Sequence, residues 1–150
     1  MARKSKWSQG FYRPINPSKY KGDLSQIVFR SSWELKMFRY CDLSENVLKW
    51  SSENHIVNYK DPITGRARRY YVDVYLKHIT KDGEVKEKLI EVKPSKQVKA
   101  PKIPKRKSKK YLKEVETYII NKAKWKAADK YAKKHGMDFV LFTEKELGIH

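Results

Sequence analysis

The sequence has little cysteine, few acids relative to bases, and no long apolar run. Cys41 is the only cysteine, which excludes an intrachain disulfide and predicts a reducing compartment. One cysteine and four scattered histidines disfavour a structural zinc site. No apolar run approaches the roughly 20 residues that cross a bilayer. The basic N-terminus lacks the apolar core of a signal peptide.

Basic residues dominate the composition instead. Lys and Arg number 35 against 17 Asp and Glu, a formal net charge of +18 in 150 residues. This length fits one domain with its own core. An excess of this size predicts a polyanionic partner, for which nucleic acid is the first candidate and an anionic membrane surface the alternative.

The N-terminal part predicts an extended arm followed by a helix. Residues 1–24 are rich in Pro, Gly, Lys and aromatics without sustained periodicity, and Trp7, Phe11 and Tyr12 are candidates to pin this basic arm to the body. Ser25 is a plausible N-cap for a helix that runs to about Asp42. Apolar residues recur along this helix at the spacing of a core-facing stripe. We therefore expect one domain over 25–150, preceded by the arm.

The remainder predicts strands, a basic loop and a second helix. Short strands are expected at 47–50 and 55–59, a turn at 61–65, and a hairpin whose strands cover 69–76 and 89–93. The segment 94–110 is rich in Pro and Lys and is expected to be a mobile basic loop. A long helix over 112–135 ends at Gly136, and a strand at 138–142 precedes a capping box at 143–146. The predicted order is α-β-β-β-α-β.

Charged residues interrupt both strands of the hairpin. Asp73 lies within the first strand, and Glu91 and Lys93 lie on one face of the second. A three-residue loop at Lys81-Asp82-Gly83, with Gly83 left-handed, is a common closure, and its register places Asp73 opposite Glu91. Opposed residues have Cβ atoms ~5 Å apart, so the two like charges repel. Either Lys93 or a bound divalent cation must compensate.

This arrangement suits magnesium-assisted cleavage of a phosphodiester. Mg²⁺ commonly takes one or two carboxylates and keeps several waters. Asp73 and Glu91 supply the carboxylates, and Lys93 supplies a positive charge beside the attacking water. Glu34 is a third candidate acid, because it shares a helical stripe with Phe38 and Cys41 and so points inward.

Each residue also has a structural interpretation. Glu34 alone is better explained as an ion pair with Arg30 or Lys36. Asp73, Glu91 and Lys93 fit a charged, solvent-facing side of an antiparallel sheet. The combination of all four with the large positive charge favours a catalytic site.

Four motifs resemble the PD-(D/E)XK nuclease superfamily, and within it the TnsA-type transposase endonucleases and the small head-completion nucleases of T-even-type tailed phages. The resemblance covers essentially the whole chain, and its motifs are Arg30-Ser31-Ser32-Trp33-Glu34-Leu35, Arg69-Tyr70-Tyr71-Val72-Asp73, Glu91-Val92-Lys93-Pro94 and Phe142-Thr143-Glu144-Lys145-Glu146-Leu147. One departure is Val72, where the superfamily name implies proline before the first acid.

The resemblance implies a restriction-endonuclease-like α/β fold, with an αβββαβ core and a mixed central sheet flanked by helices. It implies Glu34, Asp73 and Glu91 as the active-site acids and Lys93 as the catalytic lysine. Asp73, Glu91 and the Val92 backbone carbonyl would bind Mg²⁺ (or Mn²⁺ in its place), with Glu34 acting through water. It further implies a role in phage head completion, after DNA packaging and before tail joining, with head or portal proteins as partners. The protein would then work in the host cytoplasm, or as a minor virion component, without membrane or nucleotide cofactor.

Basic residues beside these motifs are candidate contacts to double-stranded DNA. They lie next to Asp73 and in the 94–110 segment, and are Arg66, Arg68, Arg69, Lys96, Lys99, Lys102, Lys105, Arg106 and Lys107. Such residues neutralise phosphates without reading bases, so little sequence specificity is expected. A non-catalytic DNA-binding plug of the phage head is the main alternative. An RNA-binding protein is a weaker one, since no RNA-recognition signature is present.

Overall fold

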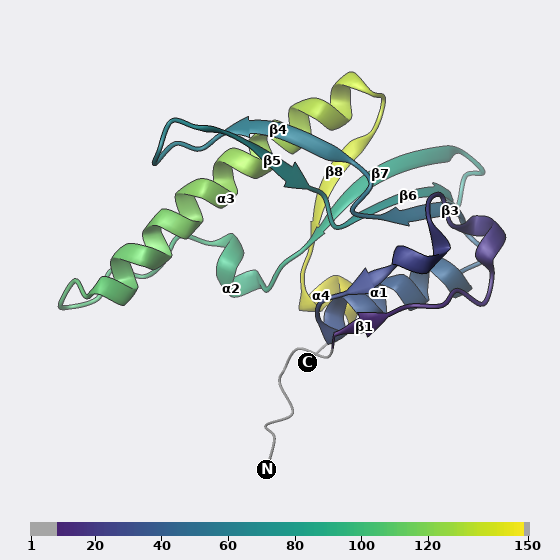
Figure 1. Ribbon diagram of the computed structural model, residues 1–150, viewed down its shortest axis with the longest axis horizontal. Coiled ribbons are helices and arrows are strands. Elements are labelled where there is room, and N and C mark those ends of the chain that lie inside the picture. The colour runs from purple at the N-terminus through teal and green to yellow at the C-terminus, as the bar shows by residue number, and fades with distance from the viewer. Residues whose placement is uncertain (1–8, 149–150) are drawn as a thin grey trace, which may run out of the picture.

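A mixed four-stranded sheet with helices on both faces forms the body of the protein (Figure 1). The computed structural model describes residues 9–148. The strand order is β3-β6-β7-β8, with β7 and β8 parallel and the other neighbours antiparallel. The elements of this core are, in chain order, α1 (Ser32–Leu43), β3 (Val47–Ser52), β6 (Val74–Ile79), β7 (Val85–Val92), α3 (Lys109–Lys134) and β8 (Asp138–Phe142). The predicted αβββαβ core with a mixed sheet is confirmed.

Each face of the sheet carries its own apolar core, because strand side chains alternate between faces. Val74, Leu76 and Ile90 pack with α1 on one face. Tyr75 and Leu89 pack with α3 on the other. Asp73 and Glu91 share the parity of Tyr75 and Leu89, so the strand pattern directs both acids toward the α3 side.

The hairpin register is as predicted. Val74 pairs with Ile90 and Ile79 with Val85, and the same register continued by one residue sets Asp73 opposite Glu91. Gly83 has φ of 80°, the left-handed conformation that the three-residue closure requires.

The long helix makes the crossover between the two parallel strands. It begins at Lys109, three residues earlier than expected, because the Ser108 side chain caps the backbone N–H of Tyr111. It ends at Lys134, and Gly136 follows with φ of 72°. A parallel pair needs such a crossover, and this one lays α3 across the sheet.

The expectation of one strand over 69–76 was wrong. The chain bends at Asp73, and the two halves belong to different sheets. β5 (Ala67–Tyr71) pairs with β4 (Ile56–Lys60) in a separate two-stranded sheet, which lies against α3. Tertiary packing of Val57, Tyr70 and Val72 on this helix outweighs the continuous strand pattern.

The predicted start of the first helix at Ser25 was also wrong. Asp23 caps only a 3₁₀ turn, η2 (Leu24–Gln26), and the chain then extends into β2 (Val28–Phe29), which pairs with β1 (Gly10–Phe11). The helix begins at Ser32 because the Ser31 hydroxyl accepts from the Glu34 N–H. The expected cap, Ser25, lies six residues before the actual one, Ser31, and the sequence pattern favoured the wrong residue.

Residues 9–24 of the expected arm lie along the body. Tyr12 is buried and its hydroxyl donates to the Asp42 carboxylate, whereas Phe11 is 68% exposed and does not anchor the chain. A single 3₁₀ turn, η1 (Pro17–Lys19), follows, and the Lys19 ammonium donates to the carbonyl oxygens of Asp42 and Ser44. Trp7 lies outside the described residues.

Two short helices complete the description. α2 (Ser95–Val98) opens the basic segment, and the rest of that segment up to α3 has no regular structure. α4 (Glu144–Leu147) follows β8, and Thr143 caps it as expected, although its hydroxyl accepts the Lys145 N–H and donates to the Glu146 carboxylate. Ser95 donates through its backbone N–H and its hydroxyl to the Glu144 carboxylate, which joins the two helices.

Two features agree with the composition. Cys41 is fully buried in the α1 core, and burial raises the pKa of its thiol, so it behaves as a small apolar side chain. Within residues 9–148, no helix has the length and apolar character of a membrane span.

We predict that Asp42→Asn destabilises the protein at neutral pH. The fully buried carboxylate accepts from the Tyr12 hydroxyl and from the backbone N–H groups of Ile15 and Asn16 at 2.6–2.9 Å. An amide would turn a donor toward one of these donors. The cost should be about 2 kcal/mol, or a Tm lower by about 6 °C.

The effect should depend on pH. Burial alone would raise the pKa of Asp42, but the three hydrogen bonds outweigh it and hold the pKa below its ordinary value. The carboxylate therefore stabilises the fold above about pH 4, and this contribution is lost as pH falls through the lowered pKa. The gap between wild type and Asp42→Asn in thermal melts should narrow at low pH. Exposed Asp82→Asn is the control, and an equal loss there would contradict the role of Asp42.

Candidate active site

A pocket of about 730 Å³ lies where β5 and β6 diverge. Residues that the sequence scatters over 60 positions meet in its wall: Glu34 from α1, Asp73 from the bend, and Glu91 and Lys93 from the end of β7. The structure therefore brings together all four residues predicted to be catalytic. Their catalytic role remains a prediction.

The Asp73 side chain supplies the hydrogen-bond acceptor that a neighbouring strand would otherwise supply at this point. Beyond Val74 the chain leaves the sheet, so β7 loses its antiparallel neighbour there. The Asp73 carboxylate accepts the Val92 N–H at 2.8 Å in place of a backbone carbonyl. The N–H and C=O of one strand residue point to the same side, so the Val92 carbonyl also faces the gap.

Glu91 is buried, with 7% of its surface exposed. Its Oε2 accepts from the Tyr70 hydroxyl and from Trp125 Nε1, the latter at 3.4 Å. Asp73 and Glu91 both line this pocket, and the Glu91 charge acts directly on the Asp73 carboxyl group. Burial raises the pKa of Asp73 well above its ordinary value, and the neighbouring Glu91 raises it further.

Glu34 enters the pocket from the first turn of α1. It is half-buried, and burial raises the pKa of its carboxyl group. The Ser31 hydroxyl lies 3.4 Å from its Oε2. The ion pair considered with Arg30 does not form, since the Arg30 guanidinium binds Glu53 through two bonds of 3.1 Å.

Glu53 occupies an unusual backbone position beside the pocket. Its φ is 54°, the only positive φ of a non-glycine residue in the described chain. Its N–H donates to the Asp73 carbonyl, and its side chain holds Arg30 against the pocket wall. A left-handed glutamate costs about 1 kcal/mol or more, and such residues concentrate at functional sites.

The donor set of the pocket fits a divalent cation of the magnesium type. Two neighbouring carboxylates, one of them buried, repel each other, and a bound cation relieves that repulsion. No three His, Cys, Asp or Glu side chains between residues 9 and 148 are close enough to hold a metal alone. Asp73, Glu91 and the Val92 carbonyl would therefore supply the protein ligands, with Glu34 acting through water, as suits an ion that keeps several waters.

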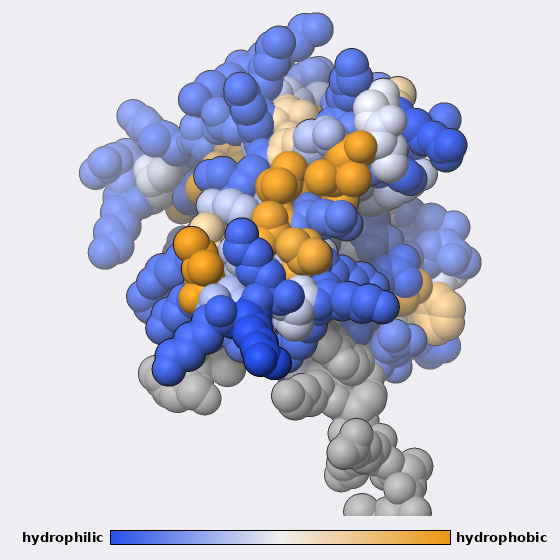
Figure 2. All heavy atoms as spheres, turned by 90° about the vertical axis from the view of Figure 1, so that its left-hand side faces the viewer, coloured by the Kyte–Doolittle hydropathy of each residue, from blue (hydrophilic) through white to orange (hydrophobic). Residues whose placement is uncertain are grey.

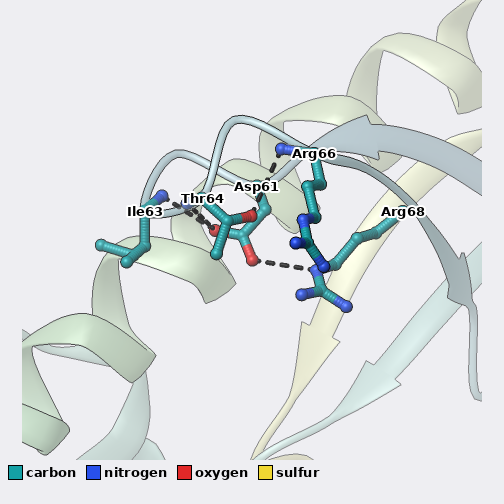
Figure 3. A network of polar contacts seen from close by, with 5 residues as sticks. All are labelled: Asp61, Ile63, Thr64, Arg66 and Arg68. Atoms are coloured by element: carbon teal, nitrogen blue, oxygen red, sulfur yellow. Dashed lines mark hydrogen bonds and ion pairs between the residues drawn. The ribbon is translucent and has the colours of Figure 1, made fainter.

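The arginines predicted beside Asp73 do not line this pocket. Arg66, Arg68 and Arg69 are exposed on the β4–β5 hairpin, which leads away from the bend. Figure 3 shows Arg68 directed at Asp61, with a bond of 3.0 Å, near the turn that Asp61 caps by accepting the Ile63 N–H. The Arg68 charge is thus partly neutralised within the hairpin.

The predicted lysines divide into two groups. Lys96 and Lys99 line a groove of about 460 Å³ between the α2 segment and α3, together with Lys110 and Lys113. Gln97 lines both this groove and the acidic pocket, so the two adjoin. Lys102, Lys105, Arg106 and Lys107 are exposed in the irregular segment beyond.

The side of the molecule at the left of Figure 1 is largely hydrophilic, with a small apolar group at its centre (Figure 2).

Three residues of the site escaped prediction. Tyr70 and Trp125 hold Glu91, and Arg30 lines the pocket while bonded to Glu53. A continuous strand had aligned Tyr71 with Asp73, but the bend turns Tyr70 inward and leaves Tyr71 47% exposed. No local pattern marks Trp125, since its partner lies 34 residues away.

Comparison with known proteins agrees with the motifs. A family described as "TnsA-like endonuclease N terminal" matches residues 44–144, a range that includes Asp73, Glu91 and Lys93. The chain is also 35% identical to the "Head completion nuclease" of Enterobacteria phage T4 over 151 residues, covering 98% of this chain and 95% of that protein.

We predict that Asp73→Asn stabilises the metal-free protein above pH 4. In the unfolded chain Asp73 ionises near pH 4, whereas its folded pKa is raised, so wild-type stability falls as pH rises through that pKa. Asparagine cannot ionise, yet its carbonyl can still accept from Val92. Melts in EDTA at pH 8 should show a gain of about 1 kcal/mol, or about 3 °C. Exposed Asp138→Asn should change little, and a less stable Asp73→Asn at pH 8 would contradict the like-charge contact.

Proposed function

The chain belongs to the TnsA-like endonuclease family, and we propose that it is a metal-dependent endodeoxyribonuclease acting in phage head completion. The observation that carries this proposal is the pocket in which two neighbouring carboxylates, Asp73 and Glu91, meet Lys93 and Glu34. A purely structural role does not explain two adjacent acids in one pocket, because placing like charges together in a partly buried site destabilises a fold.

Each residue has a role that its position supports. When bound, Mg²⁺ supplies Lewis-acid stabilisation of the phosphate and lowers the pKa of a water. Asp73 and Glu91 bind that ion, and the Val92 N–H fixes the Asp73 carboxylate in the required orientation. Lys93, half-buried at the pocket wall, holds the attacking water and balances charge at the phosphate. Glu34 orients a further water from the α1 side.

The proposed substrate is double-stranded DNA, held mainly by its phosphates. The net charge of +18 favours a polyanion, and the basic groove adjoins the acidic pocket through Gln97. Lys110 and Lys113 of α3 extend the contacts predicted from sequence. The contacts expected here are to phosphates, so cutting should have little sequence specificity.

The proposed place of action follows from the similarity to the phage T4 protein, which extends over nearly the full length of both chains. The protein would act in the host cytoplasm on a DNA-filled head before tail joining, with head or portal proteins as partners. After this step the protein would either leave the head or stay in it as a minor virion component.

A nuclease assay with metal-site variants tests the activity. Linear and supercoiled DNA are incubated with Mg²⁺, Mn²⁺ or EDTA. Cutting should require metal and fall at least about 100-fold in Asp73→Ala and Lys93→Ala. Lys86→Ala, an exposed change on the same strand, is the matched control.

Two outcomes would reject catalysis. Cutting by the variants at the wild-type rate would assign the activity to a contaminant. Absence of cutting with every metal, together with retained DNA binding, would favour a non-catalytic DNA-binding plug of the phage head.

Salt dependence tests the DNA surface separately. If about six phosphates are engaged, the slope of log K against log salt should be near −5. The double variant Lys96→Ala/Lys99→Ala should make that slope shallower by about 2. Lys133→Ala/Lys134→Ala removes the same charge from the far end of α3, about 30 Å from Lys113 along the helix. Equal changes of the slope in the two double variants would indicate that DNA binding depends on the overall charge of the protein and not on contacts in this groove.

A further inference from the structure

We propose that Tyr70 and Trp125 are positioning residues that orient Glu91 so that only its Oε1 faces the metal position. The inference rests on the proposed function, because it concerns how this chain prepares the same site. Neither residue belongs to the motif acids, and each comes from an element outside the hairpin: Tyr70 from β5 and Trp125 from α3.

The two donors converge on one oxygen atom. The Tyr70 hydroxyl and Trp125 Nε1 both donate to Oε2 of Glu91. All three side chains are nearly buried, with 5%, 7% and 7% of their surfaces exposed for Tyr70, Trp125 and Glu91. A buried carboxylate held by two ring donors loses its freedom to rotate, so its second oxygen acquires a defined direction.

Glu91 lines the pocket together with Asp73, and its Oε2 is engaged by the two donors. Oε1 is therefore the Glu91 oxygen that these donors leave for a ligand in the pocket. A cation between the two acids would therefore take one oxygen from Glu91 and not two. This geometry suits an octahedral ion that completes its shell with water.

Tyr70 is more than a core aromatic. Phenylalanine would fill the same space without placing a hydroxyl beside a buried acid. The Lys124 ammonium lies 5.6 Å from the Tyr70 ring centroid, a cation–π contact that helps to hold the ring in place. The β4–β5 sheet thus places one hydrogen-bond donor, the Tyr70 hydroxyl, beside Glu91.

The test compares Tyr70→Phe with Tyr75→Phe. Tyr75 is a matched control, since its hydroxyl also donates to a glutamate, Glu87, on the same hairpin but outside the pocket. Mg²⁺ is titrated without DNA, and its half-saturating concentration is read from thermal stability and from tryptophan fluorescence. Trp125→Phe identifies the share of the fluorescence change that comes from the residue touching Glu91.

Tyr70→Phe should raise the half-saturating Mg²⁺ concentration about 10- to 100-fold, as loss of a partner that orients a metal ligand commonly does. Excess Mg²⁺ should restore its cutting, which a merely structural defect would not allow. Tyr75→Phe should bind Mg²⁺ like wild type. The Trp125 fluorescence response should be present in wild type and shifted to higher Mg²⁺ in Tyr70→Phe.

The outcomes separate the two proposals. Wild-type Mg²⁺ affinity in Tyr70→Phe, or an equal shift in Tyr75→Phe, would overturn the positioning role while leaving the nuclease intact. Cutting by Tyr70→Phe that excess Mg²⁺ cannot restore would also overturn it. A wild-type protein that neither responds to Mg²⁺ nor cuts DNA would instead remove the proposed function on which the inference rests.

Discussion

The hydrogen bond between the Asp73 carboxylate and the Val92 N–H is the constraint on which the site depends. At this point the chain leaves the central sheet to form a second one, and β7 loses the neighbour that would satisfy its backbone. A side-chain acceptor fills that place at 2.8 Å and thereby fixes an acid at the edge of the gap. The gap itself admits the other pocket residues, which a continuous sheet would have excluded.

The surrounding architecture supports two costly features at the site. Burying Asp73 against Glu91 and holding Glu53 with a positive φ both oppose folding. Two separate apolar cores, one on each face of the sheet, offset these costs. The Asp42 network ties the N-terminal residues to α1 and so steadies the helix that carries Glu34. The interactions that stabilise the fold therefore lie outside the pocket, whereas the repulsion between like charges lies within it.

Local rules predicted the parts of the fold that local contacts control. Gly83 and the alternation of the two strands were sufficient to predict the hairpin register, because loop geometry and side-chain parity act within a few residues. The start of α1 and the break at Asp73 could not be predicted in this way. Ser25 and Ser31 are both residue types that cap helices, but Ser25 lies within the η2 turn, and the chain then extends into β2, which pairs with β1, before α1 begins after Ser31. The break depends on packing of Val72 and Tyr70 against α3.

The sequence by itself determined the chemistry available: two strand acids in opposed register, a lysine beside them, a helix acid upstream, and a large positive charge. These follow from residue type and short-range periodicity. Only the tertiary structure decided how the groups meet and which of them remain free. It paired Arg30 with Glu53, turned Arg68 onto Asp61, and placed Tyr70 and Trp125 on Glu91. Such contacts join residues 7 to 34 positions apart, and only the packing of sheets and helices sets those distances.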